Sequence, residues 1–504
     1  MSGISVSLTY SVAFRGVEAC PVEVQCALAP GLPGFSIVGL PDKAVSEAKE
    51  RVRAALASMA IAFPSKKVTI NLSPADLPKE GGHFDLPIAL ALLAELTIIP
   101  HDVILSVVSL GELSLDGKLV PVTGALPAAM TAAEEQHVLL CPAECGKEAA
   151  WVSGARIIAA KSLGDVVRHF NGQNTIADSQ PGEVIAPDKT LELRDVRGQE
   201  RAKRALEIAA AGRHHMLMVG PPGSGKSMLS RRLPGILPPL SAQEALETSI
   251  VHSIAGLLDE GGISRQRPFR DPHHTSSTAA IIGGGRLAKP GEVSLAHNGV
   301  LFMDELPEFP RNVLETLRQP LETGNIMVSR ANAHVKYPCK FMLIAAANPC
   351  KCGYMTDAER ACARVPTCGE DYMGRISGPL LDRFDLRVDV PPVSYEDLDL
   401  PANGDTSETV AERVAAAHDR QSARFEAYDG MRSNADIEGE ALEEIAAPDA
   451  EGRDLLLRAA EKFRMSARGY HRVMRVARTI ADLDHATDVR KPHVAEAISY
   501  RINS

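Results

Sequence analysis

The sequence of 504 residues is poor in aromatic residues and has no long hydrophobic run. Phe, Trp and Tyr together make up 4% of it, and a single residue is Trp. A helix that spans a membrane needs about 20 predominantly apolar residues in succession. The best candidate, residues 86–99, is shorter and contains Pro87 and Glu95. We therefore expect no membrane-spanning helix and no membrane partner.

The sequence also lacks a secretory signal and an excess of positive charge. Its first residues include no basic segment ahead of an apolar one, and its nine cysteines are an odd number. Both features are typical of free thiols in a reducing compartment, so we expect a cytoplasmic protein. The formal net charge of −10 excludes a uniformly basic nucleic-acid-binding surface, although it leaves room for a local basic channel.

The remaining composition is that of a globular protein with several domains. An α/β domain is expected over residues 1–170, and a linker rich in Gly, Asn, Gln, Ser and Pro over residues 171–190. A second α/β domain should span residues 191–392, and helical periodicity continues through residues 393–504. Within the first domain, apolar spacing predicts strands at 4–14, 67–71 and 103–110, and helices at 44–59 and 86–96.

The strongest motif is a phosphate-binding loop between an apolar strand and a helix. Its glycines allow backbone N–H groups to surround phosphate oxygens, and the following helix directs its positive end at the same anion. Lys226 would supply charge to the β- and γ-phosphates, and the hydroxyl of Ser227 would be a ligand for Mg²⁺. The motif therefore predicts binding of ATP with Mg²⁺. The loop consists of Gly220, Pro221, Pro222, Gly223, Ser224, Gly225, Lys226 and Ser227.

Two further strand ends supply the polar groups that such a loop requires. One apolar run ends in Asp304 and Glu305. Asp304 is expected to hold the Mg²⁺ through water, and Glu305 to polarise the attacking water as a general base. Another apolar run ends in Asn348, which we expect to position that water. A turn-capping Asn ahead of Pro349 is the alternative for this residue.

These motifs, with the segment Gly-Pro-Leu-Leu-Asp-Arg-Phe-Asp at residues 378–385, resemble the AAA+ ATPases of the magnesium-chelatase and MCM branch. The resemblance implies a ring of subunits in which Arg383 reaches the nucleotide of the neighbouring subunit. Arg375 is the second candidate for this arginine finger. A salt bridge to Asp382 or Asp385 is the structural alternative for Arg383.

The last arginine-rich segment is predicted to be helical. Arg468, Arg472, Arg475 and Arg478 are spaced by four, three and three residues, so they share one face of that helix. The AAA+ resemblance places a second nucleotide-sensing arginine near the start of this helix, where Arg468 is the best match and Arg472 the next. For at least two of the four arginines, a solvated basic face is the alternative.

Several segments outside the general ATPase motifs resemble the ComM/YifB family, and the resemblance covers essentially the whole chain. Proteins of this family are hexameric ATPases linked to branch migration of DNA during natural transformation. The resemblance therefore implies a homo-hexamer and a single-stranded or branched DNA partner. The segments are Arg-Pro-Phe-Arg-Asp-Pro-His-His-Thr-Ser at residues 267–276, the glycines at 283–285, and residues 295–309, 348–354 and 466–482.

The first 170 residues resemble the proteolytic domain of Lon and the related domain of RadA-type proteins, but the peptidase residues are absent. The stretch that matches the nucleophile motif, residues 80–85, contains His83 and no serine. The stretch that matches the lysine motif, residues 123–127, contains Leu126 and no lysine. Without a nucleophile and its base, acyl transfer has no starting point. We expect a scaffold domain that binds DNA or forms a ring, and not a peptidase.

Four cysteines crowd into a proposed insert at residues 349–369. Cys350, Cys352, Cys362 and Cys368 fall within nineteen residues. Four thiolates in a reducing compartment can enclose one tetrahedral Zn²⁺. The spacing differs from the usual two Cys-x-x-Cys pairs, and ordinary free thiols are the alternative.

Two inserts are expected to face the central pore of a ring and to contact DNA. One carries Arg267 and Arg270, and the other is a predicted hairpin over residues 326–337 that carries Arg330 and Lys336. Six copies of a few cations would line the pore with positive charge, which suits backbone phosphates and not base edges. Pairing with carboxylates at subunit interfaces is the alternative.

The sequence therefore predicts an α/β protein: a P-loop AAA+ core with a helical lid, preceded by an α/β Lon-protease-like domain that lacks the peptidase residues. We expect a hexameric, DNA-dependent ATPase that drives branch migration. A chelatase-like motor that remodels a protein or a metal-insertion partner is the alternative function. An ATP-dependent peptidase is disfavoured by His83 and Leu126.

Overall fold

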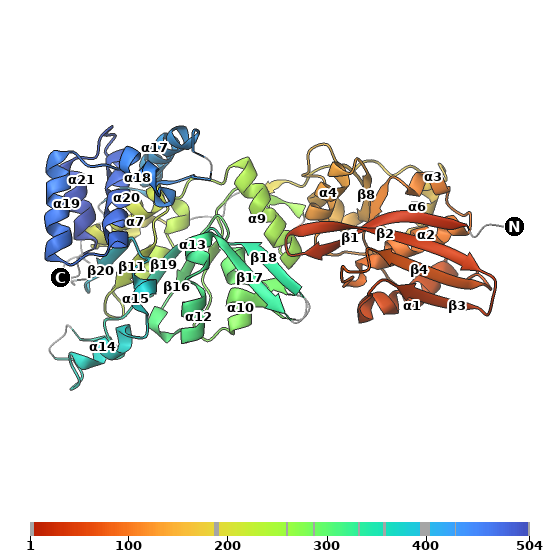
Figure 1. Cartoon of the computed structure of the whole chain (residues 1–504), viewed down its shortest axis with the longest axis horizontal. Coiled ribbons are helices and arrows are strands. Elements are labelled where there is room, and N and C mark those ends of the chain that lie inside the picture. Colours follow the sequence, from red (N-terminus) through yellow and green to blue (C-terminus); the bar gives the residue numbers. More distant parts are fainter. Residues whose placement is uncertain are drawn as a thin grey trace.

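The computed structural model describes residues 5–185, 191–258, 261–285, 288–330, 333–355, 359–393, 404–428 and 430–501. The molecule is elongated, with the N-terminal α/β region at one end and a group of C-terminal helices at the other (Figure 1). Within these described ranges, no helix is long and apolar enough to cross a membrane.

The N-terminal region is built on a seven-stranded sheet of order β3-β4-β2-β1-β5-β8-β9. The apolar helix α2 (Asp85–Glu95) is buried on nearly all sides, which explains why its residues show little polar periodicity. The predicted strands at 4–14 and 67–71 and both predicted helices are confirmed. The strand predicted at 103–110 is largely wrong, because helix α3 (His101–Ile104) occupies its start and only Val107–Ser109 is extended.

The remaining elements of this region have the following bounds. The strands are β1 (Val6–Arg15), β2 (Glu18–Ala29), β3 (Gly34–Val38), β4 (Lys67–Ser73), β5 (Val107–Ser109), β6 (Glu112–Leu113), β7 (Leu119–Val120), β8 (Val138–Pro142) and β9 (Arg156–Ala160). The helices are α1 (Lys43–Ser58), α4 (Ala125–Glu134), α5 (Gly146–Ala149) and α6 (Leu163–Phe170).

The described part of the predicted linker is attached to both neighbouring regions. Asp178 forms a β-bridge with Ile158 of β9. Further along, β10 (Val184–Ile185) pairs in parallel with β12 (Ile263–Ser264). The last five residues of the predicted linker, 186–190, lie outside the described residues. The segment up to residue 185 is therefore held by backbone pairing at both ends.

The second region contains a five-stranded sheet of order β13-β16-β19-β11-β20 in which all neighbouring strands are parallel. Parallel sheets are normally buried on both faces, and the short runs Met216–Val219, Val300–Met303 and Met342–Ala347 are accordingly almost wholly apolar. The strands are β11 (Met216–Val219), β13 (Phe269–Arg270), β16 (Val300–Met303), β19 (Met342–Ala347) and β20 (Leu386–Asp389).

Short helices and two hairpins surround this sheet. The hairpin predicted at 326–337 is confirmed as β17 (Asn325–Arg330) paired with β18 (Ala333–Pro338). A smaller one joins β14 (Gly283–Gly284) to β15 (Lys289–Pro290). The helices are α7 (Glu200–Gly212), α8 (Lys226–Ser230), α9 (Ala242–Ala255), α10 (Thr278–Ile282), α11 (Glu292–Leu295), α12 (Arg311–Thr316), α13 (Pro320–Thr323), α14 (Thr367–Met373) and α15 (Gly378–Leu381).

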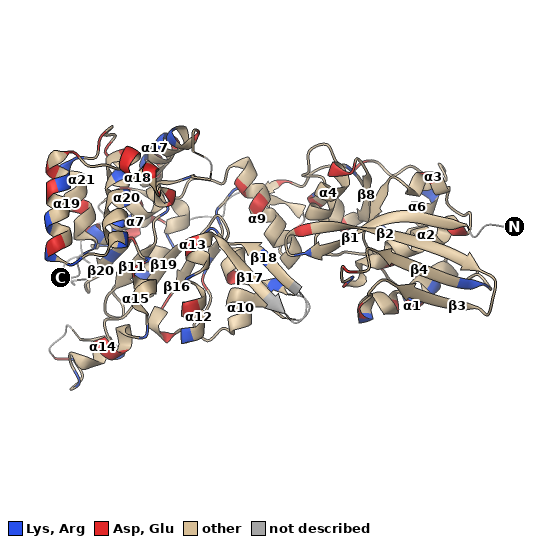
Figure 2. Cartoon of the chain, in the orientation of Figure 1, with Lys and Arg blue, Asp and Glu red and all other residues tan. Residues whose placement is uncertain are grey.

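The C-terminal residues form helices, as their periodicity predicts. Helix α20 begins at Ser466, whose hydroxyl accepts a hydrogen bond from the Gly469 N–H at 3.1 Å. Figure 2 shows acidic and basic residues interspersed over α19 and α21. The helices are α17 (Ser407–Phe425), α18 (Glu440–Ile445), α19 (Ala450–Lys462), α20 (Ala467–Leu483) and α21 (Lys491–Ser499).

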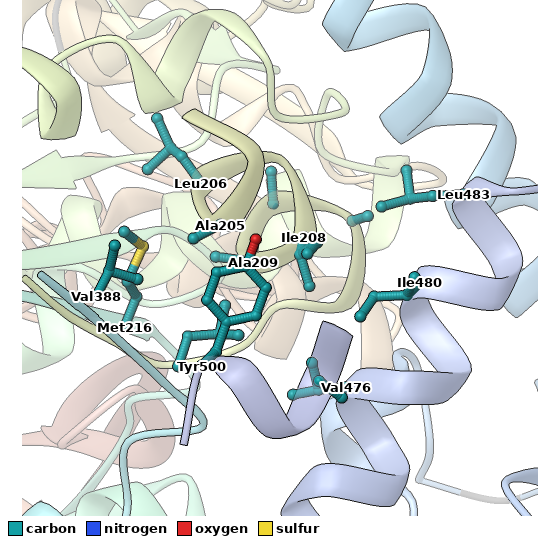
Figure 3. Close-up of a cluster of buried hydrophobic side chains, with 14 of the residues drawn as sticks. Ala205, Leu206, Ile208, Ala209, Met216, Val388, Val476, Ile480, Leu483 and Tyr500 are labelled. Atoms are coloured by element: carbon teal, nitrogen blue, oxygen red, sulfur yellow. The ribbon is translucent and has the colours of Figure 1, made fainter. Parts of the chain in front are cut away.

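Helix α7 joins the core sheet to the C-terminal helices through one buried apolar cluster (Figure 3). Ile208 of α7 belongs to the same cluster as Ile480 of α20 and Met216 of β11. Because β11 leads directly into the phosphate-binding loop, displacement of the C-terminal helices can reach that loop through packed side chains.

The N-terminal region contacts the core at several places in the described residues, including the following two. The indole Nε1 of Trp151 donates to the Gly261 carbonyl at 2.8 Å. The turn between β1 and β2 lies against the hairpin, since a Cβ built on Gly16 would stand 2.7 Å from Val335. The hairpin that we predict to contact DNA is therefore supported by the N-terminal region.

Candidate nucleotide-binding site

Three loops meet at the carboxyl edge of the five-stranded sheet. The phosphate-binding loop follows β11, Asp304 follows β16, and Asn348 follows β19. In the sheet, β19 lies between β11 and β16 and pairs in parallel with both. Since the carboxyl ends of parallel strands share one edge, the three motifs come together without any further constraint.

The loop has the backbone conformation that its glycines permit. Gly223 and Gly225 have φ angles of +77° and +94°, which residues with a Cβ rarely adopt. Gly220 is required for a different reason, because a Cβ there would stand 2.1 Å from the Val390 carbonyl oxygen. Helix α8 begins directly after Gly225 and points its free N–H groups into the loop.

Lys226 lies inside the loop and not in solvent. Its Nζ donates to the carbonyls of Gly220 at 2.7 Å and Pro221 at 2.8 Å. Asn348 Oδ1 lies 3.3 Å from the same Nζ. Burial lowers the pKa of the Lys226 ammonium, and the negative charges of Asp304 and Glu305 oppose that shift. Lys226 and Asn348 therefore lie on the same side of the site.

Ser227 and Asp304 form the second half of the site. The Ser227 hydroxyl donates to Asp304 Oδ2 at 2.5 Å, and Asp304 Oδ1 accepts from the Glu305 N–H at 3.0 Å. A hydroxyl beside a carboxylate offers the hard oxygen ligands that Mg²⁺ prefers. The donor set therefore fits the predicted Mg²⁺ and the loop fits a polyphosphate.

Glu305 is held by a residue whose role the sequence did not reveal. Its backbone is left-handed, with φ of +53°, and its side chain is 48% exposed. Oε2 lies 3.3 Å from Nδ1 of His274. His274 in turn lies against His273, with ring centroids 4.2 Å apart. In the sequence the two histidines belong only to a segment that resembles the ComM/YifB family, and the contact with Glu305 depends on the pairing of β13 with β16.

Gln199 is a second residue that sequence reasoning missed. Its left-handed backbone, φ +60°, precedes helix α7. Its Nε2 donates to the Ser224 carbonyl at 3.2 Å and to the Pro391 carbonyl at 2.5 Å. The amide thus ties the phosphate-binding loop to the exit of β20. No motif signals this contact, because its partners are 25 and 192 positions away.

Arg383 is largely buried in its own subunit. Its side chain is 5% exposed and pairs with Glu322 of α13, while Nη1 donates to the Pro379 carbonyl at 2.5 Å. Arg468 lies at the same carboxylate, with Nη2 3.9 Å from Glu322 Oε1, and is 67% exposed. In the single chain Arg383 is therefore paired with Glu322, and neither of the two predicted aspartate partners takes that place.

The other two candidate arginines, Arg375 and Arg472, differ in how firmly an acidic partner holds them. Arg375 is 49% exposed and lies 3.2 Å from Glu308. Arg472 is fixed by Asp385, which it contacts at 2.5 Å. Burial acts to raise the pKa of Asp385, but Arg472 foremost among several partners holds it well below its ordinary value. Arg472 thus joins α20 to the core, and Arg468 is the better placed nucleotide-sensing candidate.

The arginines further along α20 do not form a solvated face. Arg478 is 3% exposed and donates to Asp482 at 3.0 Å. It also donates to the carbonyls of Ala486 and Thr487, both at 2.7 Å. Arg475 is half-buried. The alternative of a solvated basic face is therefore wrong for these two residues, which support the packing of the helix.

The four clustered cysteines come together in three dimensions. The sulfurs of Cys350, Cys352 and Cys368 all lie within 4.8 Å of one another, and the first two are 3.0 Å apart. The thiol of Cys362 is in hydrogen-bond contact with those of Cys352 and Cys368. We call these four residues the cysteine knuckle. It begins shortly after Asn348 and ends in the first turn of α14, which contains Cys368 and projects from the core (Figure 1).

Of the residues predicted to contact DNA, Arg267 lies in the protein interior. Arg267 is buried, with its guanidinium bonded to Glu244 at 3.0 Å and to the Asn298 carbonyl at 2.7 Å. Burial raises the pKa of Glu244, but Arg267 and Arg213 hold it at about 2. Arg267 is therefore a structural residue and not a DNA contact. A buried charge that is fully paired cannot reach a phosphate without leaving its partner unpaired.

The remaining three candidates lie elsewhere on the core. Arg270 is 34% exposed and forms two hydrogen bonds with Glu292, at 2.5 and 2.8 Å. Lys336 is exposed on β18 of the hairpin. Arg330 ends β17 beside the hairpin turn, and its side chain lies outside the described residues. Lys336 is thus the described candidate that is placed at the surface of the hairpin.

His83, which the resemblance to Lon aligns with the nucleophile motif, is buried, and its Nε2 donates to the Val12 carbonyl at 2.9 Å. Leu126, which the same resemblance aligns with the lysine motif, is also buried. Gly82, His83 and Glu112 line a cavity of about 1390 Å³, which Tyr337 of the hairpin also lines. At this motif the cavity is therefore lined by His83 and not by a serine.

The chain matches three family models that together cover most of its length. Residues 192–398 match the model described as magnesium chelatase, subunit ChlI. Residues 22–145 match the model for subunit ChlI of Mg-chelatase, and residues 404–501 match the model for the ChlI C-terminal region. The core, the N-terminal region and the C-terminal helices therefore all have counterparts in proteins of the chelatase type.

Relatives that match over the full length of the chain define its family more narrowly than the family models do. The chain is 42% identical to the competence protein ComM of Haemophilus influenzae over 99% of this chain and 98% of ComM. It is 40% identical to YifB of Escherichia coli over 99% and 97% of the two chains. The magnesium-chelatase 38 kDa subunit of Rhodobacter capsulatus is 25% identical over 60% of this chain and 86% of its own.

Proposed function

Because the chain belongs to the ComM/YifB family of AAA+ proteins of the magnesium-chelatase type, we propose that it is a DNA-dependent ATP hydrolase. We propose further that it acts as a homo-hexamer and drives branch migration of recombining DNA during natural transformation. The observation that carries the proposal is the convergence of Lys226, Ser227, Asp304, Glu305 and Asn348 at one edge of the core sheet.

Each side chain in this group has a separate task. Lys226 exchanges the carbonyls of its own loop for the β- and γ-phosphates. Ser227 and Asp304 would hold Mg²⁺, which would neutralise phosphate charge. Glu305 orients a water molecule and takes its proton, and Asn348 fixes that water on the side opposite the leaving group. The exposure of Glu305 leaves room for water beside its carboxylate.

A second subunit is required to complete the site in this proposal. Arg383 and Arg468 meet at Glu322, so both serve the same nucleotide once Glu322 releases them. We assign that nucleotide to the neighbouring subunit and keep Arg375 as the second candidate for the finger. Glu322 acts as a placeholder anion, because it neutralises both arginines until a phosphate competes for them.

The hairpin β17–β18 is the proposed DNA element. Lys336 is exposed on it, and Arg330 stands at its turn. Six hairpins around a pore would contact phosphates through a few cations each, so binding should weaken steeply with salt. Arg270 is a secondary candidate, because contact with DNA would first require its release from Glu292.

The alternative function is a chelatase-like motor that remodels a protein or a metal-insertion partner. It is favoured by the matches to the ChlI models over the core and the C-terminal helices. ATP turnover with and without single-stranded, duplex and branched DNA separates the two. Stimulation by branched or single-stranded DNA supports the proposal. ATPase activity that is indifferent to all three DNA forms would rule it out in favour of a protein-remodelling motor.

A further inference from the structure

The cysteine knuckle brings four soft ligands into a volume that suits one metal ion. A tetrahedral Zn²⁺ with Zn–S bonds of about 2.3 Å holds its sulfurs about 3.8 Å apart. Three of the knuckle sulfurs lie within 4.8 Å of one another, and the fourth thiol contacts two of them. Cys350 is completely buried and Cys368 is 8% exposed, so solvent is excluded from one side of the cluster.

The other five cysteines do not form such a group. Cys20 is half-buried, whereas Cys26, Cys141, Cys145 and Cys339 are buried, and burial raises the pKa of these four thiols. Such thiols behave as small apolar side chains. In the described residues, the knuckle is the one group of three or more potential ligands with clustered ligand atoms. Thiolates alone favour zinc or an iron–sulfur cluster over Mg²⁺ or Ca²⁺.

The knuckle also touches the phosphate-binding loop. Gly353 follows Cys352 and has φ of +85°. A Cβ on Gly353 would stand 2.6 Å from both Cγ and Cδ of Pro222, so the knuckle backbone is packed directly on the loop. On its other side, a Cβ on Gly369 would stand 3.0 Å from the Pro349 carbonyl, next to Asn348. The knuckle therefore supports the loop and the Asn348 turn at the same time.

We propose that the cysteine knuckle holds one structural Zn²⁺ and that the closed knuckle braces the phosphate-binding loop through the contact of Gly353 with Pro222. The thiols bind as thiolates, and their protons pass to solvent when the metal enters. Without the metal, no ligand holds the four cysteine side chains together. The phosphate-binding loop then loses the support of the knuckle. The bracing rests on the proposed nucleotide site, whereas the metal content does not.

The test begins with elemental analysis of the full-length protein purified without added metal. We expect about one zinc per chain, little zinc in Cys352→Ser, and full zinc in Cys20→Ser, a cysteine far from the knuckle. Thiol titration after denaturation with a chelator should find all nine thiols. Iron in place of zinc, a thiol count reduced by a disulfide, or metal-free wild-type protein would each overturn the assignment.

The brace is tested by nucleotide affinity, measured with a fluorescent ATP analogue and Mg²⁺. We expect Cys352→Ser to weaken nucleotide binding about tenfold when Pro222 is present. In protein that already carries Pro222→Ala, the same substitution should weaken nucleotide binding by much less. Non-additivity of this kind identifies two residues that act through one contact. Equal effects in both backgrounds would remove the brace and leave the zinc assignment intact. Zinc-loaded protein that binds no nucleotide would instead overturn the proposed function.

Discussion

His274 Nδ1 lies 3.3 Å from Glu305 Oε2, so the carboxylate expected to activate water is engaged by a side chain from the adjacent strand's loop. His274 follows β13, the edge strand that pairs with β16. The same segment extends from Arg270, a secondary candidate for DNA contact. If DNA binds this segment as proposed, we expect its movement to release Glu305 and so to stimulate hydrolysis.

Replacing His274 tests that link. In His274→Ala the carboxylate of Glu305 is free without DNA, and we expect basal ATP turnover to rise about two- to fivefold. That range corresponds to the loss of one partly exposed side-chain contact of up to about 1 kcal/mol. Stimulation by DNA should shrink by the same factor. His471→Ala, an exposed histidine on α20, is the control. A fall in basal turnover would show that His274 positions Glu305 for catalysis instead.

Glu305→Gln should separate binding from hydrolysis. Asp304 and Ser227 remain to hold Mg²⁺, so affinity for ATP should be close to that of the wild type. The amide cannot take a proton from water, and turnover should fall by about 10²–10⁴-fold. Binding is measured by calorimetry and turnover by phosphate release, with Glu315→Gln as the matched control. Near-normal turnover would remove Glu305 from the proposed role.

Arg383→Ala should leave ATP binding intact and abolish most hydrolysis. An arginine finger contributes about 10³–10⁵-fold to the rate, and here the missing charge belongs to the neighbour's site. Mixed with Lys226→Ala subunits, the variant should regain part of its activity, because some interfaces then contain both an intact loop and an intact finger. If verified hexamers show no such rescue while Arg375→Ala is equally inactive, the assignment moves to Arg375.

The buried His83 predicts a pH dependence for the N-terminal region. Burial lowers the pKa of His83 from about 6.5 to about 4. Between these values the unfolded chain takes up a proton that the folded chain refuses. Stability is therefore complete above about pH 6.5 and falls as the pH approaches 4. The loss from this residue is at most about 3 kcal/mol.

His83→Gln isolates this contribution, because glutamine keeps an N–H donor for the Val12 carbonyl and does not ionise. Urea unfolding at pH 7 and pH 4.5, followed by Trp151 fluorescence, should show a smaller acid-induced loss in the variant. Trp151 is the one Trp of the chain and lies in the N-terminal region. Identical losses in the two proteins would mean that His83 is not kept neutral by folding.

The nucleotide-binding loop and its partners could be predicted from the sequence because each is encoded locally. An apolar strand of four to six residues that runs into a polar turn specifies both a buried strand and the place where its side chains emerge. Parallel pairing then brings Lys226, Asp304 and Asn348 to one edge. Membership of the ComM/YifB family was likewise predicted from contiguous segments, and the 42% identity to ComM confirms it.

The sequence did not determine which charged side chains from distant segments pair with one another. Arg267 carries the same local pattern as a DNA-binding arginine, but its burial against Glu244 depends on how α9 packs beside the sheet. Glu322 could not be assigned to Arg383, nor His274 to Glu305, for the same reason. A side chain's local sequence fixes its charge and its place on an element. Only tertiary packing decides which opposite charge reaches it and how much water remains around it, and those two quantities set its role.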